Sequence, residues 1–534
     1  MGYNERMGKE NIKQKINKVI LIVLDGFGLA PRDPGNPITA KNMPFFDSLI
    51  SSYKSHSLVA SGLVVGLEWG TYGNSEVGHG ALGTGRVVVQ SLARINSEIK
   101  DKKFFKNKAF LKILEHAKKN HSKVHLVGCV SPGGIHSHEG HLIGLLDFFA
   151  LNDFSDVCVH MITDGEDSVL EEGIKSLKRI KEALSKSGAK IVSIGGRNYA
   201  MDRVKNWPLI KKAWDVMVHN KGEKYSKTED YINQSYKKGV YDSDIIPASL
   251  VGDKEQGIKI EDGDGIIFFN FRNDRMKQIV APFVFEDFKD FDRGCALKNL
   301  LVATMTNYDD SFKVLVAYPP DILSNTLGEI ISKKGLKQVR IAEGEKEAHV
   351  TNFFNGGKLD AYKGEERIIA HSRILIGKGY LEHPEMSAPE ITKNVTEAVD
   401  KEYSLVVVNF ANSDMVAHSG NIPAIEKALQ VVDKSLEKIV KSSDLSKTAI
   451  IITADHGNSE EMIDPDTDKP DTQHSTSNVP VIFINEQFAE KNKKNLDNFY
   501  QENPIGSLID IAPTILSFLD IEPPKEMSGS KIIN

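Results

Sequence analysis

Three aspartates that each follow an apolar run constrain the fold of this chain more than any other feature. They are Asp25, Asp414 and Asp455. Continuous apolar runs of this length predict strands that are covered on both faces, as in a parallel sheet. Ligands of such sheets collect at the carboxyl ends of the strands, so we expect these aspartates to lie at one edge. The three runs span residues 18–24 (KVILIVL), 404–410 (SLVVVNF) and 448–454 (TAIIITA).

Amphipathic helical stretches separate the apolar runs, at residues 422–440 and 506–519 for example. Strands that alternate with helices predict an α/β fold with a mostly parallel sheet. The middle of the chain repeats the pattern, which predicts a second α/β domain. We expect strands there at 124–130, 156–163, 190–195, 265–271 and 300–305, and helices at 104–119, 140–151 and 169–185.

The order of the polar motifs indicates how these domains are connected. A chain of 534 residues is too long for one core. Candidate metal-site residues occur at 25 and 75 and then not before 414, so the chain must leave the first domain and return. We expect Asp309-Asp310 and Tyr318-Pro319-Pro320 to form the return linker. The predicted organisation is a polar tail (1–17), a discontinuous metal-binding domain (18–88 and 316–534) and an inserted substrate domain (89–315).

Composition excludes several classes of protein. The net charge of −6 provides no basic field for nucleic acid, and no apolar run approaches the length of about 18 residues that spans a membrane. The first 18 residues lack an apolar centre, which favours a polar tail over a secretion signal. Three cysteines, Cys129, Cys158 and Cys295, are an odd and sparse set that is typical of a reducing compartment. We expect Cys129 and Cys158 to be buried core thiols.

Carboxylates and imidazoles at several strand ends indicate a site for two divalent ions. Asp414 and His418 are spaced i, i+4 and share one face if that stretch is helical. Asp455 and His456 are adjacent, and His474 stands alone. Each signal alone is better explained by a turn, a helix cap or a hydrogen-bonded structural histidine. Their joint occurrence favours the metal site.

Ser75, in the stretch GNSEVGH (73–79), supplies a hydroxyl and has two interpretations. It is either the N-cap of a helix that begins near Glu76 or a nucleophile. A serine needs a base or a metal ion to become nucleophilic at neutral pH. A helix N-terminus beside it would also favour a phosphate group.

The motifs together resemble the cofactor-independent phosphoglycerate mutases, a family of the alkaline phosphatase superfamily. They occur in one consistent order over nearly the whole chain. The matching stretches are LDGFG (24–28), GNSEVGH (73–79), SPGGIHSH (131–138), GRNYAMDR (196–203), FNFRNDR (269–275), RIAEGEKEAHVTNFFNGG (340–357), PEMSAPE (384–390), NSDMVAHSGN (412–421) and TADHGN (453–458).

The resemblance implies roles for the metal-type residues. Ser75 would carry the phosphoryl group as a transient phosphoserine. One metal ion would be held by Asp414, His418 and His474. The ligands of the other would be Asp25, Ser75, Asp455 and His456. The family commonly uses manganese, with magnesium or cobalt in some members.

The resemblance also places the substrate site in the inserted domain. Arginine forks match the phosphate and carboxylate groups of phosphoglycerate, although solvated surface charge is the ordinary role of arginine. Lys346 lies outside the insertion and would contact the phosphoryl group and take part in catalysis. The residues expected to contact the substrate are His136, Arg197, Arg203, Arg272, Arg275 and Lys346.

The stretch TDGED (163–167) holds both an expected catalytic residue and a departure from the family. Asp167 matches the residue that moves protons between the two glycerate hydroxyls, although Asp residues in such a stretch also form turns. Glu166 stands where the family has a substrate-binding arginine. We therefore expect Glu166 in the substrate site with its charge reversed.

The function implied by the resemblance is the interconversion of 3-phosphoglycerate and 2-phosphoglycerate without bisphosphoglycerate. The protein would be a cytoplasmic monomer, and its partner would be the small-molecule substrate phosphoglycerate. Two alternatives remain open at this stage. One is a metal-dependent phosphatase or a mutase of another sugar phosphate, and the other is a catalytically inactive homologue that binds a ligand.

Overall fold

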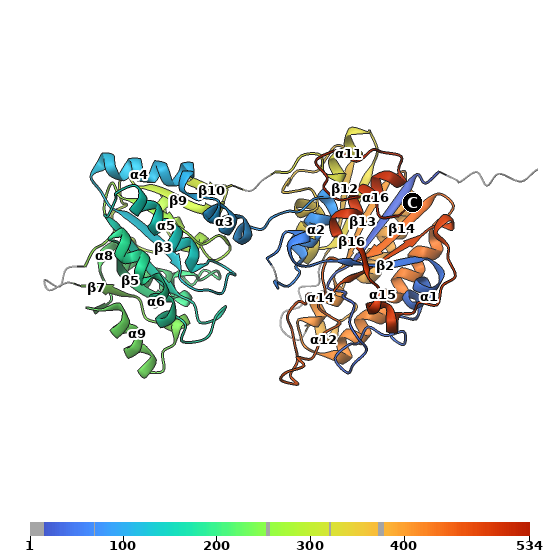
Figure 1. Cartoon of the computed structure of the whole chain (residues 1–534), viewed down its shortest axis with the longest axis horizontal. Helices are drawn as coiled ribbons and strands as arrows, with labels where there is room; N and C mark the ends of the chain where they lie inside the picture. The colour runs from blue at the N-terminus through green and yellow to red at the C-terminus, as the bar shows by residue number, and fades with distance from the viewer. Residues whose placement is uncertain (1–14, 69, 252–256, 320–321, 372–378, 534) are drawn as a thin grey trace, which may run out of the picture. The chain divides into compact units, whose positions relative to one another are not determined.

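The chain forms two compact units in a computed structural model that describes residues 15–68, 70–251, 257–319, 322–371 and 379–533. The first unit combines the residues up to Gln90 with those after residue 320. The second unit comprises residues 91–320. The predicted α/β fold class is confirmed, since each unit contains a mostly parallel sheet with helices around it (Figure 1).

The sheet of the first unit brings together strands from both ends of the chain. Its order is β12-β11-β13-β1-β14-β15-β2-β16. Strand β1 pairs in parallel with β13 and β14, and Figure 1 shows it in blue beside these orange strands. Strand β15 runs antiparallel to β14 and to β2. The strands are β1 (Lys18–Leu24), β2 (Lys54–Val59), β11 (Gln338–Glu343), β12 (Glu365–Ala370), β13 (Leu405–Phe410), β14 (Thr448–Thr453), β15 (Val479–Ile484) and β16 (Pro504–Ser507).

The centre of this sheet is buried on both faces, as its apolar runs predict. Every residue from Val19 to Leu24 is fully buried. One group of helices contains α1, α13, α14 and α15, and another contains α2, α11 and α16. The helices are α1 (Pro44–Ser52), α2 (Ser75–Thr84), α11 (Leu327–Lys333), α12 (Gly379–Glu382), α13 (Ala388–Val399), α14 (Asn412–Ala417), α15 (Ile422–Ser442) and α16 (Ile511–Phe518).

The second unit has its own sheet, in the order β10-β9-β8-β3-β4-β5-β7-β6. The strands from β10 to β5 pair in parallel, and the contact of β5 with β7 is antiparallel. The carboxyl ends of β8, β3, β4 and β5 therefore meet at one edge. The strands are β3 (Val124–Cys129), β4 (Val157–Thr163), β5 (Lys190–Gly196), β6 (Glu223–Tyr225), β7 (Ala248–Leu250), β8 (Gly265–Phe268), β9 (Leu301–Thr306) and β10 (Leu315–Tyr318).

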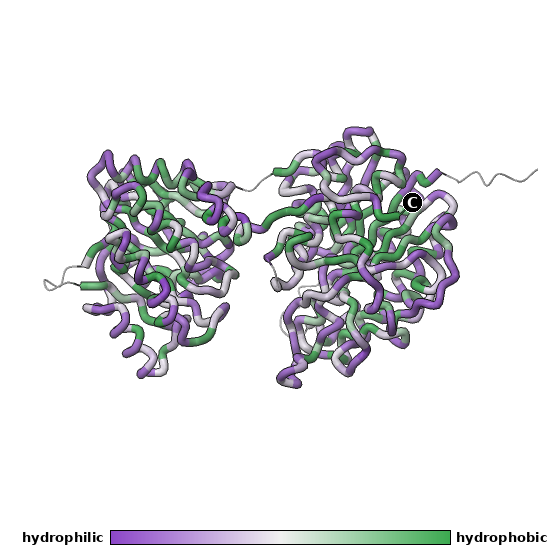
Figure 2. Tube along the Cα trace, viewed as in Figure 1, coloured by the Kyte–Doolittle hydropathy of each residue, from purple (hydrophilic) through white to green (hydrophobic). Residues whose placement is uncertain are grey.

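Two apolar clusters cover the two faces of this second sheet. Along β3, Leu126 belongs to one cluster and Val127 to the other, as alternation along a strand requires. Figure 2 shows the strands as mostly apolar and the helices as carrying polar stretches. The helices are α3 (Ser91–Lys100), α4 (Lys108–Asn120), α5 (Glu139–Leu151), α6 (Gly173–Ser187), α7 (Arg197–Ala200), α8 (Trp207–His219), α9 (Thr228–Lys237) and α10 (Lys277–Val284).

Several predicted elements differ from the structure at their ends. The helix predicted at 169–185 begins only at Gly173, and the helix predicted at 506–519 begins at Ile511 because Pro504–Ser507 forms strand β16. Tyr318, predicted in a linker, ends strand β10 and so belongs to the second sheet. Apolar side chains at the ends of helices and strands look alike in sequence, since burial and not local propensity decides their conformation.

Other predictions concern single residues and termini. Cys129 and Cys158 are buried, as expected, and Cys295 is exposed. Most of the predicted tail, residues 1–14, lies outside the described residues, and Ile16 is buried. None of the described helices is both long and apolar enough to cross a membrane.

Candidate functional site

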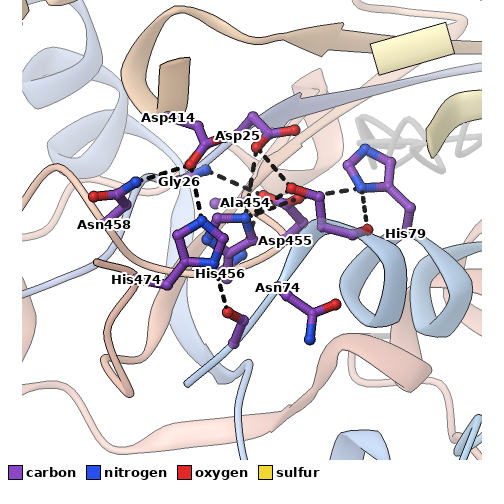
Figure 3. Close-up of polar contacts among 12 residues, drawn as sticks. Asp25, Gly26, Asn74, His79, Asp414, Ala454, Asp455, His456, Asn458 and His474 are labelled. Atoms are coloured by element: carbon purple, nitrogen blue, oxygen red, sulfur yellow. Dashed lines mark hydrogen bonds and ion pairs between the residues drawn. The ribbon is translucent and has the colours of Figure 1, made fainter. Parts of the chain in front are cut away.

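Three buried aspartates and three histidines meet at the carboxyl edge of the first sheet. Figure 3 shows the aspartates together with His456 and His474. Asp25 follows β1, Asp414 lies in α14 directly after β13, and Asp455 follows β14. These three strands are neighbours, which explains how residues about 430 positions apart become adjacent. Asp25 and Asp455 are fully buried and Asp414 is 3% exposed.

The six side chains form two groups with the geometry of metal ligands. Asp414, His418 and His474 form one group, and Asp25, Asp455 and His456 form the other. Within each group the candidate ligand atoms all lie within 4.8 Å of one another. Oxygen and imidazole nitrogen are donors that suit manganese, magnesium, cobalt and zinc.

The imidazoles are oriented in a way that favours metal binding. Each one uses its Nδ1 to donate a hydrogen bond to a backbone carbonyl. The other nitrogen, Nε2, then carries a lone pair that faces the site, as in most metal-binding histidines. The three bonds are His418 to Thr472 (2.8 Å), His474 to Gly73 (2.8 Å) and His456 to Gly457 (3.1 Å).

The geometry of the first ligand group suits a metal ion. His418 Nε2 and His474 Nε2 lie 3.3 Å apart, and both approach the same oxygen, Oδ1 of Asp414, at 3.4 and 3.3 Å. A divalent ion placed among these three atoms would accept a lone pair from each of them. The residues present therefore fit a divalent ion.

Lys346 Nζ lies among the carboxylates of both groups. It donates to Asp25 Oδ1 at 2.7 Å and to Asp414 Oδ2 at 2.8 Å, and it lies 3.0 Å from Ser75 Oγ. Burial would lower the pKa of Lys346, but attraction to Asp25 and Asp414 raises it, so the amine is charged. One lysine cannot balance three buried carboxylates, which leaves negative charge for cations to neutralise.

The surroundings shift the pKa values of Asp25 and Asp414 in opposite directions. Burial and repulsion by Asp455 raise the pKa of Asp25. Burial would also raise the pKa of Asp414, but Lys346 holds it well below its usual range. Bringing such carboxylates together costs free energy that a structural role alone does not explain.

Ser75 is the first residue of α2 and presents its hydroxyl to the second ligand group. Its Oγ lies 3.1 Å from Asp25 Oδ1 and 2.9 Å from His456 Nε2. Asn74 is the N-cap, because its side chain accepts a bond from Val77 N at 3.0 Å. The capping interpretation of Ser75 is therefore wrong, and its hydroxyl faces the second ligand group instead.

Supporting side chains that the sequence analysis did not identify hold the ligands in place. Asn409 Nδ2 donates to Asp25 Oδ2 at 2.7 Å and lies 3.0 Å from His79 Nε2. His79 Nδ1 in turn lies 3.1 Å from Asp455 Oδ2. Asn458 Nδ2 donates to Asp414 Oδ1 at 2.9 Å. A polar residue inside the apolar run 404–410 was the signal available for Asn409.

Two glycines allow the backbone to pack closely around the site. Gly26 adopts a φ of +68°, and a Cβ there would lie 2.8 Å from Asp414 Cβ. A Cβ on Gly78 would lie 2.4 Å from Asp455 O, so α2 reaches the end of β14 only because this residue is glycine. Any side chain at either position would push the ligands apart.

The second unit brings four arginines together at the carboxyl ends of β8, β3, β4 and β5. We call Arg197, Arg203, Arg272 and Arg275 the arginine cluster. Arg197 is 2% exposed, whereas the side chains of Arg203 and Arg272 are 51% and 47% exposed. His136 follows β3 and is tied to this region, because its backbone oxygen accepts bonds from Phe271 N and Arg272 N.

Carboxylates accompany every arginine of the cluster. Arg197 Nη1 donates to Asp164 Oδ1 at 2.6 Å and to Asp167 Oδ2 at 2.5 Å. Arg203 Nη1 lies 2.9 Å and Arg272 Nε 3.1 Å from Asp274. Glu166 Oε2 lies 3.3 Å from Arg197 Nη2 and 4.0 Å from Arg275 Nη2.

Two further groups set the electrostatics of this region. Burial would raise the pKa of Asp164, but hydrogen bonds from Ser131 and Arg197 hold it below its usual range. Burial and the neighbouring Arg197 and Arg272 lower the pKa of His136 to about 4, so this imidazole is neutral at pH 7. Asp164 and Asp274 were not singled out from the sequence, although both lie within stretches that were.

Comparison with known proteins decides the family. Residues 95–310 match the model of the BPG-independent PGAM N-terminus, and residues 338–505 match that of type I phosphodiesterase / nucleotide pyrophosphatase. The 2,3-bisphosphoglycerate-independent phosphoglycerate mutase of Trichodesmium erythraeum is 44% identical over 97% of this chain and 96% of its own length. The mutase of the same name from Acetivibrio thermocellus is 41% identical over 96% of this chain and 99% of its own length.

The chain belongs to the 2,3-bisphosphoglycerate-independent phosphoglycerate mutase family. A crystal structure of Leishmania mexicana phosphoglycerate mutase at low cobalt concentration supports the assignment. It shares 27% identity and a TM-score of 0.71, with 98% of each chain covered. The resemblance inferred from the motifs is therefore confirmed, and family membership together with the two ligand groups supports divalent metal binding.

The structure places the residues predicted from the mutase motifs in two sets. The first unit collects Asp25, Ser75, Lys346, Asp414, His418, Asp455, His456 and His474. The second unit collects His136, Glu166, Asp167, Arg197, Arg203, Arg272 and Arg275. Their catalytic roles remain predictions.

Proposed function

We propose that this protein interconverts 3-phosphoglycerate and 2-phosphoglycerate through a phosphoserine at Ser75. The observation that carries the proposal is the position of Ser75 Oγ, 2.9 Å from His456 Nε2 and 3.0 Å from Lys346 Nζ, beside two metal-ligand groups. A hydroxyl in that environment is a nucleophile and not a structural cap. Membership of the mutase family supports the same conclusion.

Two divalent ions would be held by Asp414, His418 and His474, and by Asp25, Ser75, Asp455 and His456. Such ions supply charge neutralisation for a transferring phosphoryl group. Manganese is the proposed metal, with magnesium or cobalt as substitutes, because the family that the motifs indicate commonly uses it and the carboxylate and imidazole ligands are compatible with it. Metal analysis of the purified protein tests this choice.

The residues of the chain itself account for the other steps. We assign binding of the substrate phosphate and carboxylate to the arginine cluster and His136. Ser75 Oγ forms a bond to phosphorus while the ester bond to the glycerate oxygen breaks. Lys346 stabilises charge on the transferring group, since its ammonium lies beside Ser75 Oγ.

Proton movement is assigned to Asp167. Its carboxylate takes the proton of the free glycerate hydroxyl and passes it to the departing glycerate oxygen, and the deprotonated hydroxyl then attacks the phosphoserine. Ser75 passes its own proton to Asp25 Oδ1, which accepts a hydrogen bond from Ser75 Oγ at 3.1 Å, and takes it back when the phosphoryl group leaves. Arg197 positions Asp167 by donating from Nη1 at 2.5 Å.

A simple phosphatase is the rival function, because the two metal-ligand groups of the first unit would serve it equally well. The arginine cluster with Asp167 favours the mutase, since hydrolysis needs no proton donor for a second hydroxyl. An enolase-coupled assay with manganese and without bisphosphoglycerate is expected to show turnover. Phosphorus NMR should show 2-phosphoglycerate as the main product, and a predominance of inorganic phosphate would contradict the proposal.

An inactive homologue is the second alternative. All residues of the two ligand groups are present and oriented for binding, which argues against it.

We further propose that the protein is a cytoplasmic monomer that binds neither nucleic acid nor membranes. The net charge of −6 argues against nucleic-acid binding, the three free cysteines are typical of a reducing compartment, and the monomer follows from the family resemblance. Light scattering of the purified protein tests the monomer.

A further inference from the structure

The arginine cluster contains its own counter-ions. Four guanidinium groups face the four carboxylates of Asp164, Glu166, Asp167 and Asp274. His136 adds no charge at pH 7, because its pKa is lowered to about 4 by burial and by Arg197 and Arg272. The region that would receive an anionic substrate is therefore electrically neutral.

The four carboxylates are not equivalent. Asp164 is 3% exposed and is bound by Ser131 Oγ at 2.7 Å, by the backbone of Asp167 and by Arg197. Asp167 is held by Arg197 and faces His136. Asp274 lies between Arg203 and Arg272. These three carboxylates have fixed positions inside the cluster.

Glu166 differs from them in exposure and in strength of contact. Its side chain is 40% exposed, and its Oε2 lies 3.3 Å from Arg197 Nη2 and 4.0 Å from Arg275 Nη2. These contacts are longer than the 2.5 and 2.6 Å bonds from Arg197 to Asp167 and Asp164. Glu166 can therefore leave the arginines more readily than Asp164 or Asp167 can.

The two guanidinium groups that Glu166 reaches have unused donors. Arg197 Nε and Arg275 Nε are buried and have no hydrogen-bond partner among the described residues. A bound phosphate or carboxylate would supply acceptors for such donors. Glu166 thus contacts two guanidinium groups that keep an unpaired donor among the described residues.

We propose that Glu166 is a charge-selectivity residue of the substrate site. In the free protein its carboxylate occupies Arg197 and Arg275, and an anionic ligand must displace it. The displaced carboxylate stays close by, so it repels ligands more strongly as their charge increases. The site thereby favours singly phosphorylated acids over doubly phosphorylated ones. This inference rests on the proposed function of the site.

The test uses binding to the full-length, metal-loaded protein with a Ser75→Ala background that prevents turnover. Dissociation constants for 3-phosphoglycerate and 2,3-bisphosphoglycerate are measured by calorimetry. Glu166→Gln keeps the size of the side chain and removes its charge. Glu171→Gln is the matched control, because Glu171 is exposed nearby and carries the same charge.

We expect Glu166→Gln to bind 3-phosphoglycerate about 5-fold more tightly, which is the factor for about 1 kcal/mol of displaced ion pair. The gain for 2,3-bisphosphoglycerate should be larger, at least about 10-fold, because repulsion scales with ligand charge. The control should match the parent, and the melting temperatures of all three proteins should agree. Glu166→Ala should change both constants in the same direction.

Equal or weaker binding of both ligands by Glu166→Gln would overturn the selectivity role while leaving the proposed function intact. Equal gains for the two ligands would overturn it as well, since a general effect is not selectivity. If the parent protein binds neither ligand, the proposed function itself fails. The calorimetric series therefore separates the two conclusions.

Discussion

The two metal-ligand groups of the first unit and the arginine cluster of the second unit differ in how deeply their charged side chains are buried. Asp25, Asp414 and Asp455 are at most 3% exposed, and amides, imidazoles and backbone groups hold them. In the arginine cluster, Arg203 and Arg272 are about half exposed and pair with a partly exposed carboxylate. Burial holds the charges of the proposed reaction centre in fixed positions, and partial exposure lets charges rearrange in the proposed substrate site. Substitutions should therefore have large effects on catalysis in the first region and moderate effects on binding in the second.

The largest effect is expected for Ser75→Ala. Loss of the hydroxyl that contacts His456 Nε2 and Lys346 Nζ should lower turnover by at least about 10⁴-fold, the scale seen for lost nucleophiles. Circular dichroism and metal content should not change. Ser48→Ala, an exposed serine of α1, serves as the control. Activity within about 10-fold of the parent would remove Ser75 from the mechanism, because the loss of a nucleophile costs far more.

Lys346→Met should follow, with turnover lowered by about 10²–10³-fold. The physical reason is that the variant loses the one ammonium group found beside Ser75 Oγ among the described residues. Metal content by mass spectrometry should stay at two ions, since Lys346 is not a ligand. Lys494→Met, which removes a partly exposed lysine of the same unit, is the control. Loss of the metal ions together with activity would show that Lys346 acts on the ligands instead.

Glu343→Gln should change stability rather than catalysis. Burial and repulsion by Glu345 raise the pKa of the Glu343 carboxyl group to about 7 from 4.5. Its ionised form therefore opposes folding above pH 7, the cost is absent below about pH 4.5, and it grows as pH rises between these values. The variant should be more stable by about 3 kcal/mol at pH 8 and by much less at pH 5.

Melting curves of Glu343→Gln and the parent at pH 5 and pH 8 measure this difference. Glu397→Gln, on the exposed side of α13, is the control and should show no pH-dependent difference. A stability gain of equal size at both pH values would show that the buried charge is not the cause. Such a result would weaken the contrast between the two regions, because the buried carboxylate of Glu343 in the first unit would then not destabilise the fold.

The smallest effect is expected for Arg272→Ala in the second unit. Loss of one charged hydrogen-bond donor should raise KM by about 10–100-fold and leave kcat nearly unchanged. Metal content and melting temperature should match those of the parent, because this side chain is 47% exposed. Arg32→Ala, an exposed arginine of the first unit, is the control. A fall in kcat with constant KM would place Arg272 in the chemical step and weaken the contrast between the two regions.

Much of this molecule could be predicted from its sequence. The apolar runs at 18–24, 404–410 and 448–454 each became a buried parallel strand, since only a sheet covered on both faces suits them. The aspartates after them lie at one edge for the same topological reason. Element ends were less predictable, as at Gly173 and Ile511, because there tertiary contacts outweigh local propensity.

Residue type and order were enough to establish the α/β class, the family and the set of side chains that could bind metal and phosphate. How those side chains are used depended on the folded chain. Folding turned each imidazole Nε2 toward the carboxylates, assigned the helix cap to Asn74 and left the hydroxyl of Ser75 for chemistry. It also placed Glu166 on two arginines. Hydrogen bonds and ion pairs act over a few ångströms between residues far apart in the chain, so their partners emerge only when the sheet brings those residues together.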